Sequence, residues 1–343
     1  MKTIKNHDMI YKELYMSLAI KEAWKYQILT YPNPAVGALI LHNGEVIALE
    51  AHQKAGTSHA EVLALIKAYE NITDKSIDFN RFNAKDAHNF LYSLPNGFFK
   101  DCTIFVTLEP CSHIGKTPSC AMLLAKMGVK KVVVATLDPI AKHSGGVEIL
   151  KSSGIEVEIG VCKEEADELL EPFIIWQKRA FILFKIAQSS NGRIGGGYLS
   201  SQLSLKHVHK LRSVCTRMII GGNTVRVDRP TLDCRFIDAT PPDITIYSKR
   251  DNFDKDIPLF LVPNRVVTIT NTLKDFNKPS LILVEGGDGM LNALKDRIDW
   301  IVQYQIPKIS SNSLTYSADI KLQFLHQNRI DIDLILWSRI IFE

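Results

Sequence analysis

Two short segments, far apart in the chain, carry residues that bind transition metals. The first contains His59 and Glu61, and the second contains Cys111 and, after eight further residues, Cys120. One histidine and two thiolates leave one position of a tetrahedral zinc ion free, which suits a bound water better than a structural site does. Glu61 is close enough in sequence to carry protons for that water. We therefore predict a fold that joins the two segments in a catalytic zinc site of His59, Cys111 and Cys120, with Glu61 as the catalytic residue.

The residues around each segment are typical of helix starts. Ser58 and Glu61 match a capping box in front of the apolar stretch 62–66, so the same glutamate is expected to cap its helix. Pro118 is typical of an early helical position and predicts a second helix start beside Cys120. The helix dipole favours charged sulfur at such a place and lowers the pKa of a thiol.

Length and composition favour a two-domain protein of a reducing compartment. A chain of 343 residues is long for one ordinary domain. Its 41 basic and 37 acidic residues leave a net charge of +4 without blocks of like charge, which argues against nucleic acid as the main partner. Six cysteines are too sparse for a disulfide scaffold. With no apolar leader and no apolar run of membrane-spanning length, we expect a cytoplasmic protein without a membrane partner. We also expect a homo-oligomer.

The first half alternates helical and strand patterns, which predicts a layered α/β domain over residues 1–162. Strands are expected at 37–41, 46–51, 103–108, 131–136 and 155–161, with a hairpin turn at Asn43-Gly44. Helices are expected at 9–24, from 58, from 118 to about 128, and from 145 to 154. Residues 71–102 form an insertion that we expect to carry a short helix, and a lid or a subunit contact remains open.

A charged helical linker over 163–180 leads to a second α/β domain at 181–343. Its strands are expected at 182–187, 217–220, 244–247, 266–270 and 281–284, and its helices at 203–213 and 290–297. Two of these strands run into glycine pairs, Gly221-Gly222 and Gly286-Gly287. Glycines let a backbone approach a ligand, and free N–H groups at a helix start can hold a phosphate. The pattern alone is compatible with a phosphate or nucleotide site, but a glycine pair after a strand is more often a tight turn.

Longer stretches of the first half resemble the deaminase part of the bifunctional riboflavin-biosynthesis deaminase/reductases. They are residues 30–37, 52–62 and 106–120. The eight-residue gap between the cysteines is the discriminating detail, because most cytidine, guanine and tRNA-adenosine deaminases are known for a two-residue gap. The resemblance implies a cytidine-deaminase-like layered α/β/α domain. It places Asn33, His52, Ser112, His113 and Lys116 around the substrate.

The second half is similar to the reductase of the same family, which has a dihydrofolate-reductase-like α/β fold and uses NADPH. The similar residues are 185–193, 211–212, 222–235 and 285–287. By position, it implies that the cofactor contacts Ala187, Thr224, Gly286 and Gly287. It implies that the substrate contacts Lys185, Arg212, Asp228, Leu232, Arg235 and Glu285. The two arginines would suit a sugar phosphate, because a guanidinium group binds phosphate in a bidentate manner.

The chain departs from the family pattern at several points. Asp138 begins Asp-Pro-Ile-Ala where the family has Asp-Pro-Asn-Pro, and Asn191 replaces the usual aspartate. The stretch between Gly192 and Ser200 is short and lacks the expected Ser-x-Trp. Ser248 stands where an aspartate is expected after a strand. A trimmed loop could lose a cofactor contact without losing reduction.

The resemblance as a whole implies a two-step enzyme of riboflavin biosynthesis that uses Zn²⁺ and NADPH. It would hydrolytically deaminate 2,5-diamino-6-(5-phosphoribosylamino)pyrimidin-4(3H)-one and then reduce the ribosyl group to ribityl. One alternative is a deaminase alone, with a reductase-like domain that serves as a scaffold or oligomerisation module. The other is a zinc-stabilised nucleic-acid-binding module, which requires a fourth protein ligand. His113 is the nearby candidate for that ligand.

Overall fold

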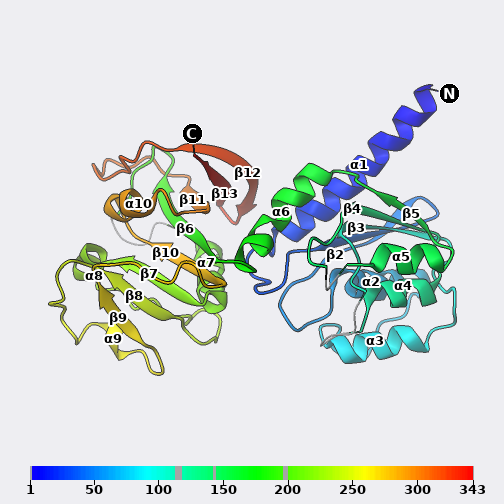
Figure 1. The fold of residues 1–343 in the computed structure, drawn as a ribbon, viewed down its shortest axis with the longest axis horizontal. Coiled ribbons are helices and arrows are strands. Elements are labelled where there is room, and N and C mark those ends of the chain that lie inside the picture. Colours follow the sequence, from blue (N-terminus) through cyan, green and yellow to red (C-terminus); the bar gives the residue numbers. More distant parts are fainter. Residues whose placement is uncertain (1, 113–117, 142–143, 196–199, 343) are drawn as a thin grey trace. The chain divides into compact units, whose positions relative to one another are not determined.

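The protein consists of two compact units, residues 1–174 and 175–343 (Figure 1). The structure is a computed structural model that describes residues 2–112, 118–141, 144–195 and 200–342. The division falls inside helix α6 (Lys163–Trp176), later than the domain end that we predicted at residue 162. The apolar side chains of Ala166, Leu169 and Leu170 in this helix are buried. Among the described helices, none is both long enough and apolar enough to span a membrane.

The first unit is built on a five-stranded sheet with the order β2-β1-β3-β4-β5. Its strands are β1 (Gly37–His42), β2 (Glu45–Ala51), β3 (Cys102–Leu108), β4 (Lys131–Thr136) and β5 (Glu156–Ile159). Strand β1 is antiparallel to β2 and β3, whereas β3, β4 and β5 are parallel. The hairpin turn predicted between β1 and β2 is confirmed, with φ of 52° at Asn43 and 87° at Gly44.

Helices cover both faces of this sheet, as the α/β/α prediction requires. Ala38 and Ile40 of β1 share a core with α2 (Ala60–Thr73) and α4 (Cys120–Met127). On the opposite face, the Tyr15 ring of α1 (Lys2–Trp24) lies 5.5 Å from the Phe105 ring of β3. Helix α5 (Gly146–Ser152) packs beside α4. Figure 1 shows α1 on one side of the strands and α2, α4 and α5 on the other.

The insertion at 71–102 contains the expected short helix, α3 (Ala84–Ser93), and is packed into the unit. Phe90 and Phe98 lie against Tyr69 of α2, with ring centroids 4.9 and 5.8 Å away. Leu91 and Phe99 are completely buried in the same core. The segment is therefore a fixed part of the domain core.

The second unit is built on an eight-stranded sheet with the order β12-β13-β11-β6-β10-β7-β8-β9. The strands are β6 (Ala180–Ser189), β7 (Arg217–Gly221), β8 (Asp243–Tyr247), β9 (Val267–Thr270), β10 (Ser280–Glu285), β11 (Trp300–Ile306), β12 (Lys321–Ile330) and β13 (Asp333–Ile341). From β11 to β9 neighbouring strands are parallel, and β13 and β12 continue the sheet antiparallel. The five strands and two helices that we predicted here are confirmed.

The helices of the second unit are α7 (Gln202–Val214), α8 (Gly222–Asp228), α9 (Pro258–Leu261) and α10 (Asp288–Leu294). Helices α8 and α10 begin directly after the parallel strands β7 and β10. In sheets of this kind, ligands bind at the carboxyl ends of the strands. The fold thus places both glycine pairs, Gly221-Gly222 and Gly286-Gly287, at one such edge.

Candidate active site

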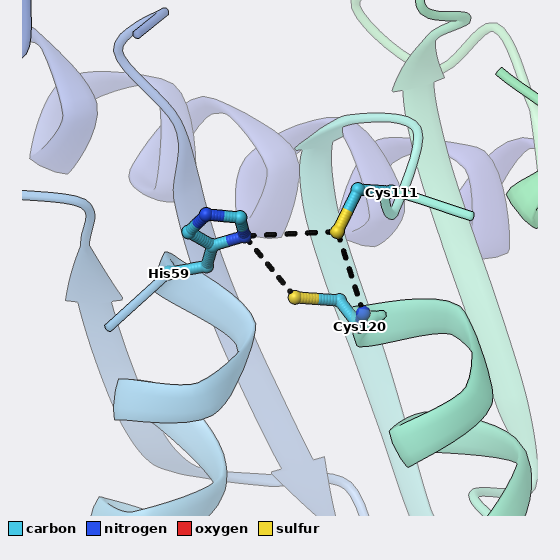
Figure 2. A group of neighbouring side chains, drawn as sticks. All are labelled: His59, Cys111 and Cys120. Carbon is cyan, nitrogen blue, oxygen red and sulfur yellow. Dashed lines mark hydrogen bonds between the residues drawn. The ribbon is translucent and has the colours of Figure 1, made fainter. Parts of the chain in front are cut away.

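The predicted metal ligands meet where strand β3 ends and two helices begin (Figure 2). His59 is the N-cap of α2, and Cys120 is the first residue of α4. The Ser119 hydroxyl caps α4 by accepting the N–H of Met122 at 3.2 Å. Cys111 follows the end of β3, so three local signals in the sequence converge on one point.

The histidine nitrogen and the two sulfur atoms have the N···S separations that zinc needs, and all three atoms lie within 4.8 Å of one another. His59 Nδ1 lies 3.7 Å from Cys111 Sγ and 3.3 Å from Cys120 Sγ. Zn–S bonds of about 2.3 Å and Zn–N bonds of about 2.0 Å in a tetrahedron give N···S separations of about 3.6 Å. The residues therefore fit a zinc ion. Among the described residues, His59, Cys111 and Cys120 are the three possible ligands that lie close enough together to bind one metal ion. His113 and Lys116 lie outside the described residues.

Hydrogen bonds among these groups determine which sulfur carries charge. The pKa of Cys111 is lowered to about 4, chiefly by the hydrogen bond with the Cys120 thiol and also by His59 and the Cys120 N–H, which together outweigh the effect of burial. The Cys120 N–H donates to Cys111 Sγ at 3.4 Å. The pKa of Cys120 is raised well above its usual value by its hydrogen bond with Cys111 and by burial. The start of α4 therefore supports the charge of Cys111, as predicted from the helix dipole. The raised pKa of Cys120 is the opposite of our prediction for a thiol at this helix start, because burial and the neighbouring Cys111 outweigh the dipole.

The predicted capping box is wrong. Helix α2 has no side-chain cap, and its N-cap is His59 rather than Ser58. The Ser58 hydroxyl instead donates to the carbonyl of Arg81 at 2.6 Å, because the folded insertion brings that buried acceptor next to it. Glu61 is consequently not used for capping. It is 4% exposed, and burial raises the pKa of its carboxyl.

Glu61 and two of the metal ligands, His59 and Cys111, line a cavity of about 380 Å³, which lies within the usual size range of small-molecule sites. Two predicted substrate residues, Asn33 and His52, line the same cavity. His52 Nδ1 lies 3.1 Å from the carbonyl of Ser58, so it donates, and Nε2 accepts from Asn33 Nδ2 at 3.1 Å. Burial and the nearby His59 lower the pKa of His52 to about 4, which keeps the ring neutral.

Glu109 organises the loop beside the cavity, a role that our sequence analysis missed. Its carboxylate accepts the N–H groups of Asp138 at 3.1 Å and of Gly145 and Val147 at 3.0 Å. The predicted substrate residue Ser112 belongs to the same loop contacts, because its hydroxyl donates to the Ser144 carbonyl at 2.6 Å. The signal in the sequence was an acidic residue directly before the Pro-Cys pair that carries a predicted ligand.

In the second unit, three predicted substrate residues lie together. Lys185 and Glu285 are paired on the neighbouring strands β6 and β10. Arg212 of α7 donates from Nε and Nη2 to the Glu285 carboxylate at 2.9 and 3.1 Å, and Lys185 Nζ lies 3.4 Å from it. Burial alone would raise the pKa of Glu285, but the charges of Arg212 and Lys185 outweigh it and hold the pKa at about 2.

The other predicted substrate residues are placed differently. We expected both arginines to bind a phosphate in a bidentate manner. For Arg212 this is wrong, because its Nε and Nη2 already donate to the Glu285 carboxylate. Of the two, Arg235 alone stays a candidate for a bidentate phosphate contact. Arg235 is about half exposed and pairs with Asp233 at 2.8 Å. Leu232 is buried, and Asp228 is exposed at the end of α8.

Packing explains three of the four glycines at the strand ends. A Cβ on Gly221 or Gly286 would lie 2.7 or 2.6 Å from Met290 Cγ, and one on Gly222 would lie 2.5 Å from Ser248. Gly287 is different, because a Cβ there would meet only Ile194 at 3.9 Å. The starts of α8 and α10 thus share one edge with open space at Gly287, which fits a dinucleotide phosphate. Thr224 lies in the first turn of α8, and Ala187 lies on β6 opposite Tyr304.

The departures from the family pattern have local partners. Asn191 donates to the Ser310 carbonyl at 2.9 Å and accepts its N–H at 3.0 Å, a double contact that an aspartate could not make. Ser248 accepts a hydrogen bond from Arg226 at 3.3 Å. The short stretch between Gly192 and Ser200 lies partly outside the described residues.

Comparison with known proteins agrees with the donor set of the first unit. Residues 9–136 match the family described as the cytidine and deoxycytidylate deaminase zinc-binding region. The riboflavin biosynthesis protein RibD of Aquifex aeolicus is 41% identical over 231 residues, which cover 65% of this chain and 57% of that protein. RibD of Buchnera aphidicola is 31% identical over 278 residues, which cover 79% of this chain and 67% of that protein. The chain belongs to the RibD family.

A solved structure extends the RibD likeness to both units. It is the Thermotoga maritima protein described as a diaminohydroxyphosphoribosylaminopyrimidine deaminase/5-amino-6-(5-phosphoribosylamino)uracil reductase. That protein is 27% identical and matches 98% of this chain and 100% of its own length, with a TM-score of 0.65. The family resemblance and the fold class inferred from the sequence are thereby confirmed. By sequence the chain matches less than two thirds of the A. aeolicus RibD, 57% of its length. Roles of individual residues stay predictions.

Replacing either cysteine of the metal site tests the ligand set. We expect Cys111→Ser and Cys120→Ser to reduce bound zinc from about one ion per chain to a small fraction, because a hydroxyl is a far weaker ligand than a thiolate. Elemental analysis of the purified protein measures this. Cys162→Ser is the matched control, since Cys162 contacts Ser17 and lies outside the ligand group. Zinc retained by Cys120→Ser at the wild-type level would show that the ligand set is wrong.

The ion-pair cluster of the second unit predicts a pH-dependent stability. Glu285 has a folded-state pKa of about 2 against a usual 4.5, so its contribution is present above pH 4.5 and is lost as the pH falls toward 2. At neutral pH, Glu285→Gln should lower the free energy of unfolding by about 3–5 kcal/mol, because Arg212 and Lys185 remain buried without an anion. Hydrogen exchange of strand β10, followed by mass spectrometry, measures it. Asp254→Asn, which breaks an exposed pair with Arg229, should change little. Equal protection in both variants would contradict the prediction.

Proposed function

We propose that this RibD-family chain catalyses two consecutive steps of riboflavin biosynthesis. The first unit deaminates 2,5-diamino-6-(5-phosphoribosylamino)pyrimidin-4(3H)-one by hydrolysis. The second unit then reduces the ribosyl group to ribityl with NADPH. The observation that carries the proposal is the group of His59, Cys111 and Cys120, whose N···S separations fit zinc. Two of these residues, His59 and Cys111, line one cavity with the buried Glu61.

The residues of the first unit have distinct tasks in deamination. Bound zinc supplies Lewis-acid activation of water for attack on the amine-bearing ring carbon. Glu61 takes the proton of that water and passes it to the leaving nitrogen, so that ammonia departs. Asn33 is held through its Nδ2 by His52, which leaves its Oδ1 to accept a hydrogen bond from a substrate amino or hydroxyl group.

The second unit supplies positioning and charge for the reduction. Bound NADPH supplies the hydride that reduces the aldehyde carbon of the opened sugar. Backbone N–H groups at the starts of α8 and α10, beside the space at Gly287, suit its pyrophosphate. Glu285 is a fixed anion that accepts hydrogen bonds from substrate hydroxyls, and Arg235, about half exposed, is available to the sugar phosphate.

The alternatives receive less support. A nucleic-acid-binding zinc module is not favoured because the chain belongs to the RibD family. Its candidate fourth ligand, His113, lies outside the described residues. A scaffold-only second unit has no need of the buried cluster of Lys185, Arg212 and Glu285, which costs desolvation energy. All six cysteines are free, which supports a reducing compartment such as the cytoplasm. A homo-oligomer stays a prediction.

Glu61→Gln separates proton transfer from metal binding. The variant should keep its zinc and lose roughly 10²–10⁴-fold in the rate of ammonia release from the pyrimidine ribotide, the usual contribution of a general acid–base residue. A coupled ammonia assay and elemental analysis of the same sample measure both quantities. Glu45→Gln, an exposed glutamate on β2, should behave as wild type. A zinc-loaded Glu61→Gln protein with the normal rate would remove Glu61 from the mechanism.

The reductase half is tested with the deaminated ribotide and NADPH. We expect wild-type protein and Glu61→Gln to oxidise NADPH equally, because Glu61 belongs to the other unit. Lys185→Met should reduce NADPH oxidation at least tenfold and leave ammonia release unchanged. The absorbance of NADPH follows the reaction. Absence of NADPH oxidation by the wild-type chain with authentic product would support the scaffold alternative instead.

A further inference from the structure

The insertion at 71–102 has a contact with the metal centre that the reaction does not explain. Its turn at residues 80–83 passes directly beside Ser58, the residue before the ligand His59. Ser58 is completely buried. Its hydroxyl donates to the Arg81 carbonyl at 2.6 Å, and its N–H donates to the Phe82 carbonyl at 3.2 Å. The insertion thus holds both hydrogen-bond donors of this residue.

The third polar group of Ser58, its backbone carbonyl, contacts a residue that lines the cavity. Its carbonyl accepts the Nδ1–H of His52 at 3.1 Å, and His52 in turn holds Asn33. One residue therefore connects the insertion to a metal ligand on one side and to two cavity residues on the other. Small displacements of Ser58 would move His59 and His52 together.

The turn that holds Ser58 is itself fixed. The Arg81 guanidinium donates to Glu70 at 2.6 Å and to Glu50 at 3.4 Å, which ties the turn to α2 and β2. Asn83 caps α3 by accepting the N–H groups of Lys85 and Asp86. Such a turn can hold a neighbouring residue in place, because its own position is set by charged and capping contacts.

The same insertion brings a second residue toward the metal centre. His88 of α3 is 2% exposed, and its Nδ1 has no hydrogen-bond partner among the described residues. Burial lowers the pKa of His88 to about 4, and the charge of His59 acts in the same direction.

We propose that the insertion is an outer layer of the metal centre, and that Ser58 is the positioning residue through which its turn at 80–83 sets the placement of His59. This inference rests on the metal site of the proposed function but not on its substrate. It predicts that removing the Ser58 hydroxyl changes both the affinity of the site for the metal and the geometry of the bound metal. A purely structural Ser58 would affect only the stability of the fold.

Ser58→Ala, with Thr57→Ala as the matched control, tests the proposal. Thr57 is the adjacent residue and also carries a hydroxyl, but it donates to the Lys54 carbonyl, away from the insertion. Chelator competition should show zinc affinity reduced about 10–100-fold in Ser58→Ala, the usual effect of losing an outer partner of a ligand. The visible bands of the Co²⁺-loaded protein should shift as well. Thr57→Ala should match wild type in both measurements.

Other outcomes distinguish the possible failures. If folded Ser58→Ala has wild-type zinc affinity and cobalt bands and only a lower melting temperature, Ser58 is merely structural and the inference is wrong. If Ser58→Ala does not fold, Arg81→Met, which frees the same turn from Glu50 and Glu70, must weaken zinc binding, and an unchanged affinity there also overturns the inference. A wild-type chain that binds no zinc would overturn the proposed function and this inference with it.

Discussion

The charge on the Cys111 sulfur is the constraint on which the first unit depends. A thiolate in a protein interior needs a donor or a metal ion beside it. Here the Cys120 N–H donates to the sulfur at 3.4 Å, and the ligand atom His59 Nδ1 lies 3.7 Å from it. His59 and Cys120 sit at helix starts, where free N–H groups and the helix dipole favour negative charge. The end of β3 must therefore meet the starts of α2 and α4, and the layered sheet brings them together.

The sequence was sufficient to select the candidate metal ligands that the fold brings together, because their signals are local. Each ligand stands at a helix start or just after a strand, and the strand and helix ranges that we predicted in this unit are close to those observed. The capping box failed because Ser58 bonds to Arg81, twenty-three residues away in the chain. A competing partner from a folded insertion cannot be recognised from the four residues of a capping pattern.

The second unit shows the same limit more strongly. Arg212 and Glu285 were each expected to contact the substrate, but their contact with one another was not foreseen. That contact depends on the packing of α7 against β10, which is not encoded in a short motif. Our sequence analysis also assigned no strand beyond residue 284, although β11, β12 and β13 form the remaining edge of the sheet.

The two buried glutamates show how surroundings divide roles between similar groups. Glu285 has two cations within 3.4 Å, so it stays ionised at every pH near neutrality and can accept hydrogen bonds but not supply a proton. Glu61 has no ion-pair partner among the described side chains, and burial raises the pKa of its carboxyl. A carboxyl that must give and take a proton needs a buried environment without cations, like that of Glu61. A carboxylate that must hold a substrate through fixed charge needs cations beside it, like those around Glu285. The two environments therefore agree with the roles that we propose, proton transfer for Glu61 and recognition of hydroxyl groups for Glu285.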